Sequence, residues 1–445
     1  MPKGKYHLIT YGCQMNKADS ERIAAVMEGL GFEATADENA ADVIILNSCS
    51  VRQSAEDRVF GKLRDYSLLR EKNPGLIVGV TGCLPGRDLD GKIRKKLMKA
   101  DLYFPIRELQ ELPTRLAGLR PDLFEVSGPA LDNYLSIAPK RPRDFHANIV
   151  IQTGCNKFCT YCVVPYARGR EWNRPAKDIL AEARAVLATG VVSLDLLGQA
   201  VNAYVAPDPE AFSPANPYKN TFAALLWELN QLEGLQRLGF TSPHPLHMDD
   251  EVIDSLALPK MMNFLNLPAQ AGNDEVLRRM NRRYTAAQYL DIIAKVRRRL
   301  PDIALGTDLI VGFPGETAEQ FEDTLKLYRA ADFDISYPAM YSPRSGTTSA
   351  RFFPDDVPRE EKKRRWRAVQ TLMEQVVLKK NQKYVGTEVE VLIDSCARGW
   401  CSGHSREMKL TRFRSEENLV GKTVVVRITK AMEWMLEGEA VSHKP

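Results

Sequence analysis

Short apolar runs alternate with longer amphipathic segments through the first third of the chain. Three of these runs have the length of buried strands and end at a cysteine, over residues 6–13, 41–49 and 76–83. Residues 19–32 have apolar positions at helical spacing, and we expect a helix there with Asp19 or Ser20 as its N-cap and Gly31 as its stop. Strands that alternate with helices are typical of a parallel sheet with helical crossovers. Residues 1–135 therefore predict an open parallel α/β sheet domain.

The same alternation returns in the central part of the chain, after a proline-containing, charged linker at residues 128–146. Strand-like runs and amphipathic helices follow one another at residues 148–155, 176–190, 191–199, 305–317 and 317–333. Repeated strand–loop–helix units favour a full or partial (β/α) barrel, in which active sites lie at the C-terminal ends of the strands. Residues 147–380 are predicted to form this domain.

The last part of the chain changes to short alternating runs without helices between them. Strands are predicted at residues 387–394, 408–413 and 422–429. They indicate a small β-barrel over residues 381–445. Between the first two strands lies a basic segment whose cationic residues are Arg398, Arg406, Lys409, Arg412 and Arg414. Cations beside Trp400, His404 and Phe413 on a small β-barrel suit an RNA-binding face, although a solvated loop has the same composition.

Composition and charge narrow the class of protein. A chain of 445 residues is expected to form two or three domains, and 44% hydrophobic with 27% charged residues is typical of globular proteins. No apolar run approaches the length of a membrane span, and the start of the chain lacks a signal-peptide core. We therefore expect a cytoplasmic protein with no membrane partner, and by default a monomer. The net charge of +4 allows a nucleic-acid partner but requires any basic surface to be local.

Three of the eight cysteines, Cys13, Cys49 and Cys83, each follow a predicted strand. Parallel strands deliver their C-terminal ends to one sheet edge, where open α/β sheets bind ligands. These cysteines could therefore converge although they are far apart in sequence; the alternative is three unrelated buried cysteines. Because we expect a reducing cytosol, no structural disulfide is predicted, and Cys396 and Cys401 are interpreted as incidental rather than as zinc ligands.

Three further cysteines lie within eight residues, as Cys155, Cys159 and Cys162. Structural zinc usually takes four ligands, and no fourth cysteine follows closely. Iron–sulfur clusters use thiolate ligands, and a 4Fe–4S cube on three thiolates leaves one iron open for a substrate. The C-x3-C-x2-C spacing follows the first barrel strand and has Tyr161 before its last cysteine. This pattern resembles the radical S-adenosylmethionine (SAM) superfamily.

Motifs along the rest of the chain resemble the methylthiotransferases of that superfamily. Similarity to their N-terminal domain is carried by YGCQMNKADSERI, ADVIILNSCSVRQSAEDRVFGKL and TGCLPG. Similarity to their radical SAM domain is carried by GCNKFCTYCVVPYARGRE, LLGQAVNAY, TDLIVGFPGET and MYSPRSGT. The C-terminal segment resembles their TRAM domain, a small RNA-binding β-module. Within the family, the segments GCQMN, NSCSVR and VVPYARG look most like the MiaB type, which acts on isopentenyl-adenosine in tRNA.

The resemblance implies two 4Fe–4S clusters and SAM as cofactors. One cluster would lie on the C-x3-C-x2-C loop, with SAM on its open iron, and an auxiliary cluster on Cys13, Cys49 and Cys83 would carry sulfur. The implied reaction adds a methylthio group to carbon 2 of isopentenyl-adenosine next to the anticodon, using two SAM molecules, electrons and sulfur. Radical cofactors suit this carbon because its C–H bond is neither acidic nor easily attacked. The implied partners are the tRNA anticodon loop, a flavodoxin- or ferredoxin-like electron donor, and a sulfur or iron–sulfur donor.

By the same resemblance, we expect SAM contacts from Tyr161, Gln199, Asn202 and Gly312. Four positions depart from the family pattern, namely Asn173, Ala200, Ala271 and Asn273. None is a cluster cysteine, so they bear on the subfamily rather than on the chemistry. Two alternative substrates stay open, threonylcarbamoyl-adenosine in tRNA and an aspartate of a ribosomal protein. From a different class, a non-catalytic iron–sulfur protein that binds RNA or transfers electrons would be expected to supply four ligands to each cluster.

Overall fold

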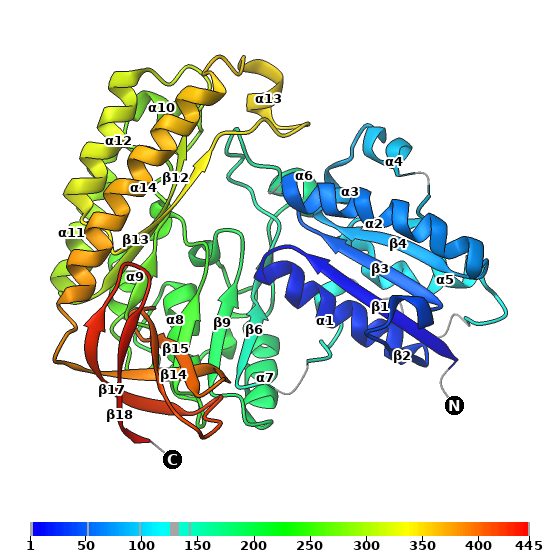
Figure 1. Ribbon diagram of the computed structural model, residues 1–445, viewed down its shortest axis with the longest axis horizontal. Coiled ribbons are helices and arrows are strands. Elements are labelled where there is room, and N and C mark those ends of the chain that lie inside the picture. The colour runs from blue at the N-terminus through cyan, green and yellow to red at the C-terminus, as the bar shows by residue number, and fades with distance from the viewer. Residues whose placement is uncertain (1–2, 51–52, 98, 125–132, 142–143, 444–445) are drawn as a thin grey trace.

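The computed structural model describes residues 3–50, 53–97, 99–124, 133–141 and 144–443. Figure 1 shows three groups of elements along the chain: an N-terminal sheet with helices, a central set of parallel strands with outer helices, and a C-terminal β-barrel. This arrangement confirms the predicted fold class. In the described part of the chain, no helix is both long and apolar enough to cross a membrane.

Five parallel strands form the N-terminal sheet in the order β2-β1-β3-β4-β5. The strands are β1 (Gly4–Tyr11), β2 (Phe32–Ala34), β3 (Val43–Ser48), β4 (Ile77–Gly82) and β5 (Leu102–Tyr103), and the helices are α1 (Gln14–Gly29), α2 (Gln53–Lys72), α3 (Cys83–Arg87), α4 (Lys92–Lys96) and α5 (Leu112–Leu119). Every residue of β3 and β4 is buried. Val43 and Ile45 pack in the core that includes α1, whereas Ile44 and Leu46 pack with α2. The two helices therefore cover opposite faces of the sheet.

Helix α1 begins earlier than predicted. Its N-cap is Cys13, and Asp19 and Ser20 are buried within the helix. The predicted cap was wrong because the Asp19 carboxylate is used for a tertiary contact: its Oδ2 accepts a hydrogen bond from Arg168 Nη2 at 2.6 Å. The predicted stop is confirmed, since Gly31 follows the last turn with a φ of 87°, a left-handed conformation that glycine adopts readily.

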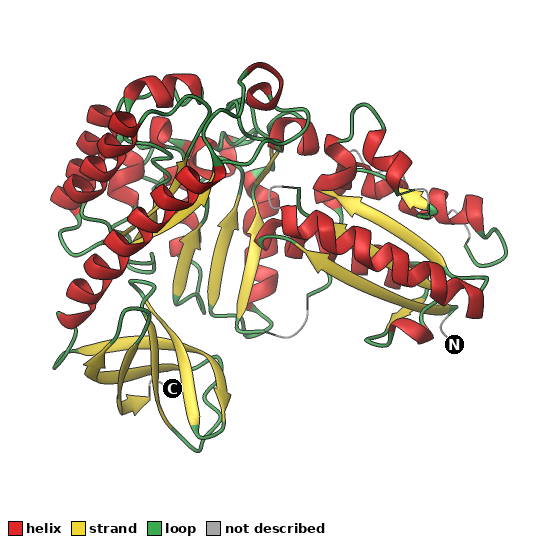
Figure 2. Ribbon diagram, turned by 45° about the horizontal axis from the view of Figure 1, so that its top comes forward, coloured by secondary structure: helices red, strands yellow, loops and turns green. Residues whose placement is uncertain are grey.

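Six parallel strands form the central domain as two sheets, β6-β9-β10 and β11-β12-β13. Their bounds are β6 (His146–Val150), β9 (Ser193–Leu197), β10 (Arg237–Phe240), β11 (Phe264–Asn266), β12 (Ala304–Val311) and β13 (Ile335–Met340). An isolated parallel bridge pairs Leu238 of β10 with Met261, just before β11, and no pairing among the described strands joins β6 to β13. The barrel is therefore partial, with helices packed outside its strands (Figure 2).

The helices of this domain follow. They are α6 (Val164–Arg168), α7 (Ala176–Leu187), α8 (Thr221–Asn230), α9 (Asp250–Ser255), α10 (Asp274–Arg279), α11 (Ala286–Arg299), α12 (Ala318–Ala331), α13 (Thr348–Phe352) and α14 (Arg359–Gln382). Along the described chain as a whole, short 3-10 helices lie at Glu38–Ala40, Ile106–Glu111, Tyr134–Ser136, Val201–Ala203, Pro209–Ala211 and Pro245–His247. A two-stranded ribbon of β7 (Gln152–Thr153) and β8 (Trp172–Asn173) flanks the loop of three cysteines. This ribbon ties the start of the loop to its end.

Five strands close into the C-terminal barrel in the order β14-β15-β16-β18-β17. They are β14 (Glu388–Ala397), β15 (Trp400–Ser405), β16 (Leu410–Arg414), β17 (Thr423–Ala431) and β18 (Leu436–His443). The prediction lacks β15 and β18. The basic segment at residues 397–414 is not a loop, because β15 pairs in antiparallel register with both β14 and β16.

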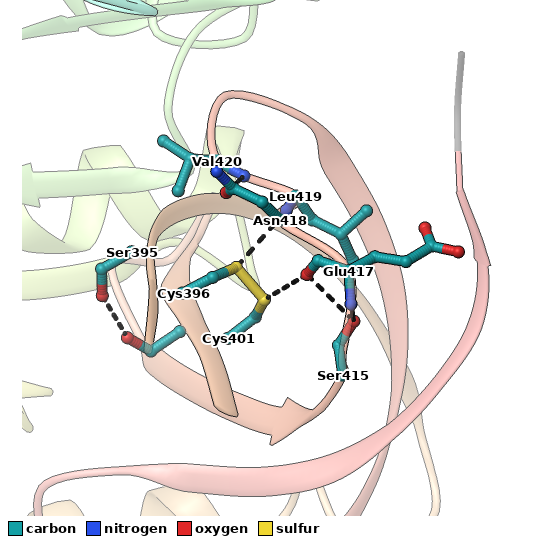
Figure 3. The surroundings of a disulfide bond; sticks show 9 residues. Ser395, Cys396, Cys401, Ser415, Glu417, Asn418, Leu419 and Val420 are labelled. Atoms are coloured by element: carbon teal, nitrogen blue, oxygen red, sulfur yellow. Dashed lines mark hydrogen bonds between the residues drawn. A yellow bond between two sulfur atoms is a disulfide. The ribbon is translucent and has the colours of Figure 1, made fainter. Parts of the chain in front are cut away.

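Cys396 and Cys401 form a disulfide, which corrects the prediction of no structural disulfide. They lie directly opposite each other on β14 and β15, with Cα atoms 4.1 Å apart. Figure 3 shows the bond beside the 415–420 segment, whose Leu419 amide lies 3.4 Å from Cys396 Sγ. The prediction rested on the expected compartment, whereas the register of a tight hairpin brings the two sulfurs together.

Candidate active site

The three cysteines at Cys155, Cys159 and Cys162 lie in the loop that follows β6 and β7, at the C-terminal side of the barrel strands. The loop is held at its base, where the Cys155 amide donates to the Gly169 carbonyl at 3.2 Å. Gly154 has a φ of 72°, and a Cβ there would lie 2.0 Å from the Arg170 carbonyl oxygen, so only glycine fits. The barrel therefore presents three free thiols on one fixed loop.

The chemistry of these thiols suits a cluster better than a single ion. Burial raises the pKa of Cys155, and it raises the pKa of Cys162 to about 12. Both groups are therefore thiols at neutral pH unless a metal displaces the proton. Among the described residues, no three His, Cys, Asp or Glu side chains lie close enough together to hold one metal ion. A 4Fe–4S cube accepts wider spacing because each thiolate binds a different iron, and the residues fit that group.

The other three cysteines follow adjacent strands of the N-terminal sheet. Tyr11 of β1 pairs with Ser48 of β3, which pairs with Gly82 of β4, so Cys13, Cys49 and Cys83 lie just beyond three neighbouring strand ends. A hydrogen bond with Cys49 lowers the pKa of Cys13 to about 6. Burial raises the pKa of Cys83, and the charge of Arg168 opposes this effect. The geometry brings together three cysteines that are far apart in the sequence.

A single short helix joins the two sets of cysteines. Helix α6 starts two residues after Cys162 and ends at Arg168, and it packs on α3, which begins at Cys83 (Figure 1). The packing is close, since a Cβ at Gly86 of α3 would lie 2.0 Å from the Ala167 carbonyl oxygen. Arg168 is 4% exposed and forms an ion pair with Asp19 of α1 at 2.6 Å. Sequence reasoning missed Arg168, because a buried arginine has no spacing signal of its own.

A cavity of about 830 Å³ opens beside Cys162. Its lining comes from all three groups of elements, and includes Ser54 of α2, Tyr337 and Met340 of β13, and Trp434 of the β17–β18 turn. The last three side chains are 49%, 40% and 50% exposed, so apolar surface faces the cavity. An exposed apolar patch of this kind is typical of a binding site. Trp434 was not predicted, because the sequence does not show that the C-terminal barrel reaches this cavity.

Arg344 connects this cavity with the N-terminal cysteines. Its Nη1 donates to Gln53 Oε1 of α2 at 2.7 Å, and both side chains line the cavity. Burial lowers the pKa of Arg344, and the nearby charges of Glu56 and Cys49 oppose that shift. Arg344 therefore joins the cavity wall to α2, the helix that follows Cys49 along the chain.

Of the four residues expected to contact SAM, Tyr161 alone is in the described lining of this cavity. Gln199 is half-buried directly after Gly198 and β9. Asn202 is buried and its carboxamide is occupied: Nδ2 donates to the His244 and His247 carbonyls, and Oδ1 accepts from the His244 amide at 2.7 Å. The Asn202 side chain therefore positions the 244–247 loop.

Gly312 also has a packing role. A Cβ there would lie 2.3 Å from Lys362 Cγ of α14, and its φ is 67°. Its amide donates to Glu316 Oε2 at 2.6 Å, and Glu316 pairs with Arg365 of α14 at 2.8 Å. The turn at residues 312–316 thus anchors α14 against the end of β12.

The basic residues of the C-terminal barrel fall into two groups. Arg412 and Arg414 lie over the Trp400 ring, 4.6 and 4.1 Å from its centroid, and Arg398 occupies the β14–β15 turn. Arg406 instead donates to carbonyls of the central domain, at Pro259, Met261 and Gln236. Lys409 is 8% exposed and pairs with Asp334 at 3.3 Å. Arg406 and Lys409 therefore hold the barrel to the central domain, and RNA binding by the five basic residues stays a prediction.

The four departures from the family pattern are accommodated within the fold. Asn273 is the N-cap of α10 and accepts hydrogen bonds from two amides of its first turn, as a serine could. Asn173 Oδ1 accepts from Gln152 Nε2 at 3.0 Å, and the Ala200 amide donates to Gln152 Oε1 at 3.3 Å. Ala271 is fully buried in the central core. None of the four lines the cavity.

Comparisons with known proteins agree with this architecture. Three family models match successive parts of the chain: Uncharacterized protein family UPF0004 at residues 5–105, Radical SAM superfamily at 149–328 and TRAM domain at 382–441. Among solved structures, the radical S-adenosylmethionine methyltransferase TsrM from Kitasatospora setae, with cobalamin and a [4Fe-4S] cluster bound, has a TM-score of 0.56 at 14% identity, over 90% of this chain and 81% of that one. At this identity the likeness concerns the fold alone.

Sequence relatives are closer. The tRNA-2-methylthio-N(6)-dimethylallyladenosine synthase of Moorella thermoacetica is 40% identical over 98% of both chains. The enzyme of the same name from Bacillus cytotoxicus is 38% identical over 99% of this chain and 86% of its own. Because this similarity runs through all three groups of elements, the chain belongs to the family of tRNA-2-methylthio-N(6)-dimethylallyladenosine synthases, which are radical SAM enzymes.

Proposed function

We propose that this enzyme adds a methylthio group to carbon 2 of isopentenyl-adenosine next to the anticodon of tRNA. The observation that carries the proposal is the position of the two cysteine sets. One set lines the 830 Å³ cavity through Cys162, and the other lies at strand ends of the N-terminal sheet, whose helix α2 reaches the cavity wall through the bond between Gln53 and Arg344. A reaction that both activates a carbon and delivers sulfur to it needs two such centres next to one substrate pocket. The names of the full-length relatives support this substrate.

The cysteines would hold the two cofactors. Cys155, Cys159 and Cys162 would bind a 4Fe–4S cluster that leaves one iron open for SAM, and Cys13, Cys49 and Cys83 would bind the auxiliary cluster. When bound, the first would supply the electron that cleaves SAM to a 5′-deoxyadenosyl radical, and the second would supply sulfur, with two SAM consumed per product. Helix α6 fixes the spacing between the two sets. Electrons would come from a flavodoxin- or ferredoxin-like donor, and sulfur from a separate donor.

The three domains would share recognition of the RNA. A base from a single-stranded loop is the cheapest to move into a pocket, because it has few partners to lose. Tyr337, Met340 and Trp434 offer apolar surface to the isopentenyl group. On the barrel, Arg412 and Arg414, which lie over the Trp400 ring, offer cations to the loop backbone, and Trp400 offers an aromatic side chain to the bases. One copy of the chain contains all these parts, which supports a monomer as the active unit.

Nucleoside mass spectrometry tests the proposal. Isopentenylated tRNA is incubated anaerobically with the cluster-reconstituted chain, SAM, sulfide and a reductant. A mass gain that matches a methylthio group on isopentenyl-adenosine is the expected result. Cys13→Ala should abolish this product while SAM is still cleaved to 5′-deoxyadenosine, and Cys155→Ala should abolish both. Cleavage of SAM without any change in that nucleoside would refute the substrate, and threonylcarbamoyl-tRNA would then be tested.

A further inference from the structure

The segment between α10 and α11 forms hydrogen bonds to the three-cysteine loop. The Asn281 carboxamide donates to the Lys157 and Phe158 carbonyls, at 3.1 and 3.0 Å. The next residue, Arg282, is 5% exposed, and its Nη1 lies 3.4 Å from Cys159 Sγ, within hydrogen-bonding range for sulfur. A buried guanidinium is thus directed at one of the proposed cluster ligands.

The orientation of this guanidinium is fixed on its other sides. Arg282 Nε donates to the Tyr284 hydroxyl at 2.9 Å, and Nη2 donates to the Pro268 carbonyl at 3.3 Å. The Tyr284 hydroxyl donates in turn to the Ala269 carbonyl at 2.9 Å. A planar fork with each arm engaged cannot rotate away from the sulfur. A lysine, with one flexible ammonium, could not reproduce these contacts.

Arg282 forms no ion pair with a carboxylate among the described residues; its guanidinium contacts the Tyr284 hydroxyl, the Pro268 carbonyl and Cys159 Sγ. An uncompensated buried cation is strongly unfavourable. Cys159 is the one neighbour of these three that becomes anionic when it binds iron. A negatively charged group on the cysteine loop would therefore balance the buried charge of Arg282.

We propose that Arg282 is a positioning residue that donates a hydrogen bond to the Cys159 thiolate and stabilises the reduced form of the SAM-binding cluster. The inference rests on the proposed cluster at Cys155, Cys159 and Cys162. Reduction adds one negative charge to the cluster, and a fixed cation with an N–H···S bond stabilises that charge more than it stabilises the oxidised form. Hydrogen bonds to the sulfurs and local charge are established determinants of cluster potential. The electron that starts SAM cleavage would therefore enter more easily with Arg282 in place.

The test is a reductive titration followed by EPR on the full, anaerobically reconstituted chain. Adding SAM identifies the signal of the SAM-binding cluster, because that signal alone should change. In R282Q we expect the ratio of reduced to oxidised SAM-binding cluster at a fixed potential to fall about tenfold, which is about 59 mV for one electron. The signal that does not respond to SAM should titrate as before. R283Q is the matched control. It removes the same charge from the neighbouring residue, and Arg283 is exposed.

Equal midpoint potentials in R282Q and R283Q would overturn the inference. If R282Q does not fold, Tyr284→Phe decides: it keeps the charge but removes the acceptor for Arg282 Nε, so the potential should fall by less than in R282Q, and an unchanged potential would overturn the inference. The readout does not depend on tRNA. A wild-type chain with no SAM-responsive signal would instead contradict the proposed function itself, so the two failures are distinguishable.

Discussion

Replacing Arg168 with methionine should destabilise the junction between the N-terminal and central domains. Arg168 and Asp19 form an ion pair at 2.6 Å with side chains that are 2% and 0% exposed. Arg168→Met keeps the length of the side chain but leaves the Asp19 carboxylate buried without its cation. Removing one partner of a buried pair costs about 3–5 kcal/mol, because the remaining charge stays desolvated. The loss should fall on α1 and α6, which carry the two residues.

A double-mutant cycle measures this effect. Urea unfolding of the cluster-free chain would be followed by circular dichroism for Arg168→Met, Asp19→Asn and the double variant. The double variant should be at least about 1 kcal/mol more stable than the sum of the single losses predicts, since neither buried charge remains. Arg278→Met is the control, because its pair with Glu275 is exposed and should contribute nothing measurable. Additive losses, or an Arg168→Met variant as stable as the control, would refute the reasoning.

Three further outcomes are expected. Burial lowers the pKa of His244 to about 2 and that of His247 to about 4, whereas histidines of the unfolded chain are protonated near pH 6.5. The free energy of unfolding should therefore be constant above pH 6.5 and decrease as the pH falls towards 4. A urea midpoint measured against pH checks this, and the fall should be smaller in His247→Gln. Trp434→Ala should raise KM for isopentenylated tRNA while uncoupled SAM cleavage persists, and an unchanged KM would remove Trp434 from the substrate pocket. Arg414→Gln should weaken tRNA binding and reduce its dependence on salt, whereas Arg406→Gln should leave that dependence unchanged, as a salt series of filter-binding isotherms would show.

The sequence was sufficient where a local pattern determines the structure. The runs that end at Cys49 and Cys83 are continuous apolar segments because β3 and β4 are buried on both faces, and such segments are recognisable without a partner. The strand-then-cysteine pattern also places three cysteines at neighbouring strand ends, because parallel strands all point one way.

Sequence reasoning failed where a distant partner decides the outcome. Aspartate is a residue type that is common at N-caps, and only the position of Arg168 shows why Asp19 lies inside a helix. Lysine is a residue type that commonly contacts RNA, and only the ion pair with Asp334 of the central domain shows why Lys409 is buried. The strand β15 carries glycine and serine residues that are typical of loops, and it is held by pairing on both of its edges. Each of these contacts spans residues that no local pattern connects.

The bond between Asp19 and Arg168 also has a consequence for biosynthesis. The ribosome releases the N-terminal sheet first, and domains generally begin to fold in that order. The core beneath α1, however, includes Tyr134, Val150 and Leu197, which emerge much later. Until those residues and Arg168 leave the ribosome, the nascent sheet has an unpaired carboxylate and an uncovered apolar face. The N-terminal domain can therefore finish folding only after the first half of the central domain has been synthesised. The segments that carry the two cysteine sets would then fold together.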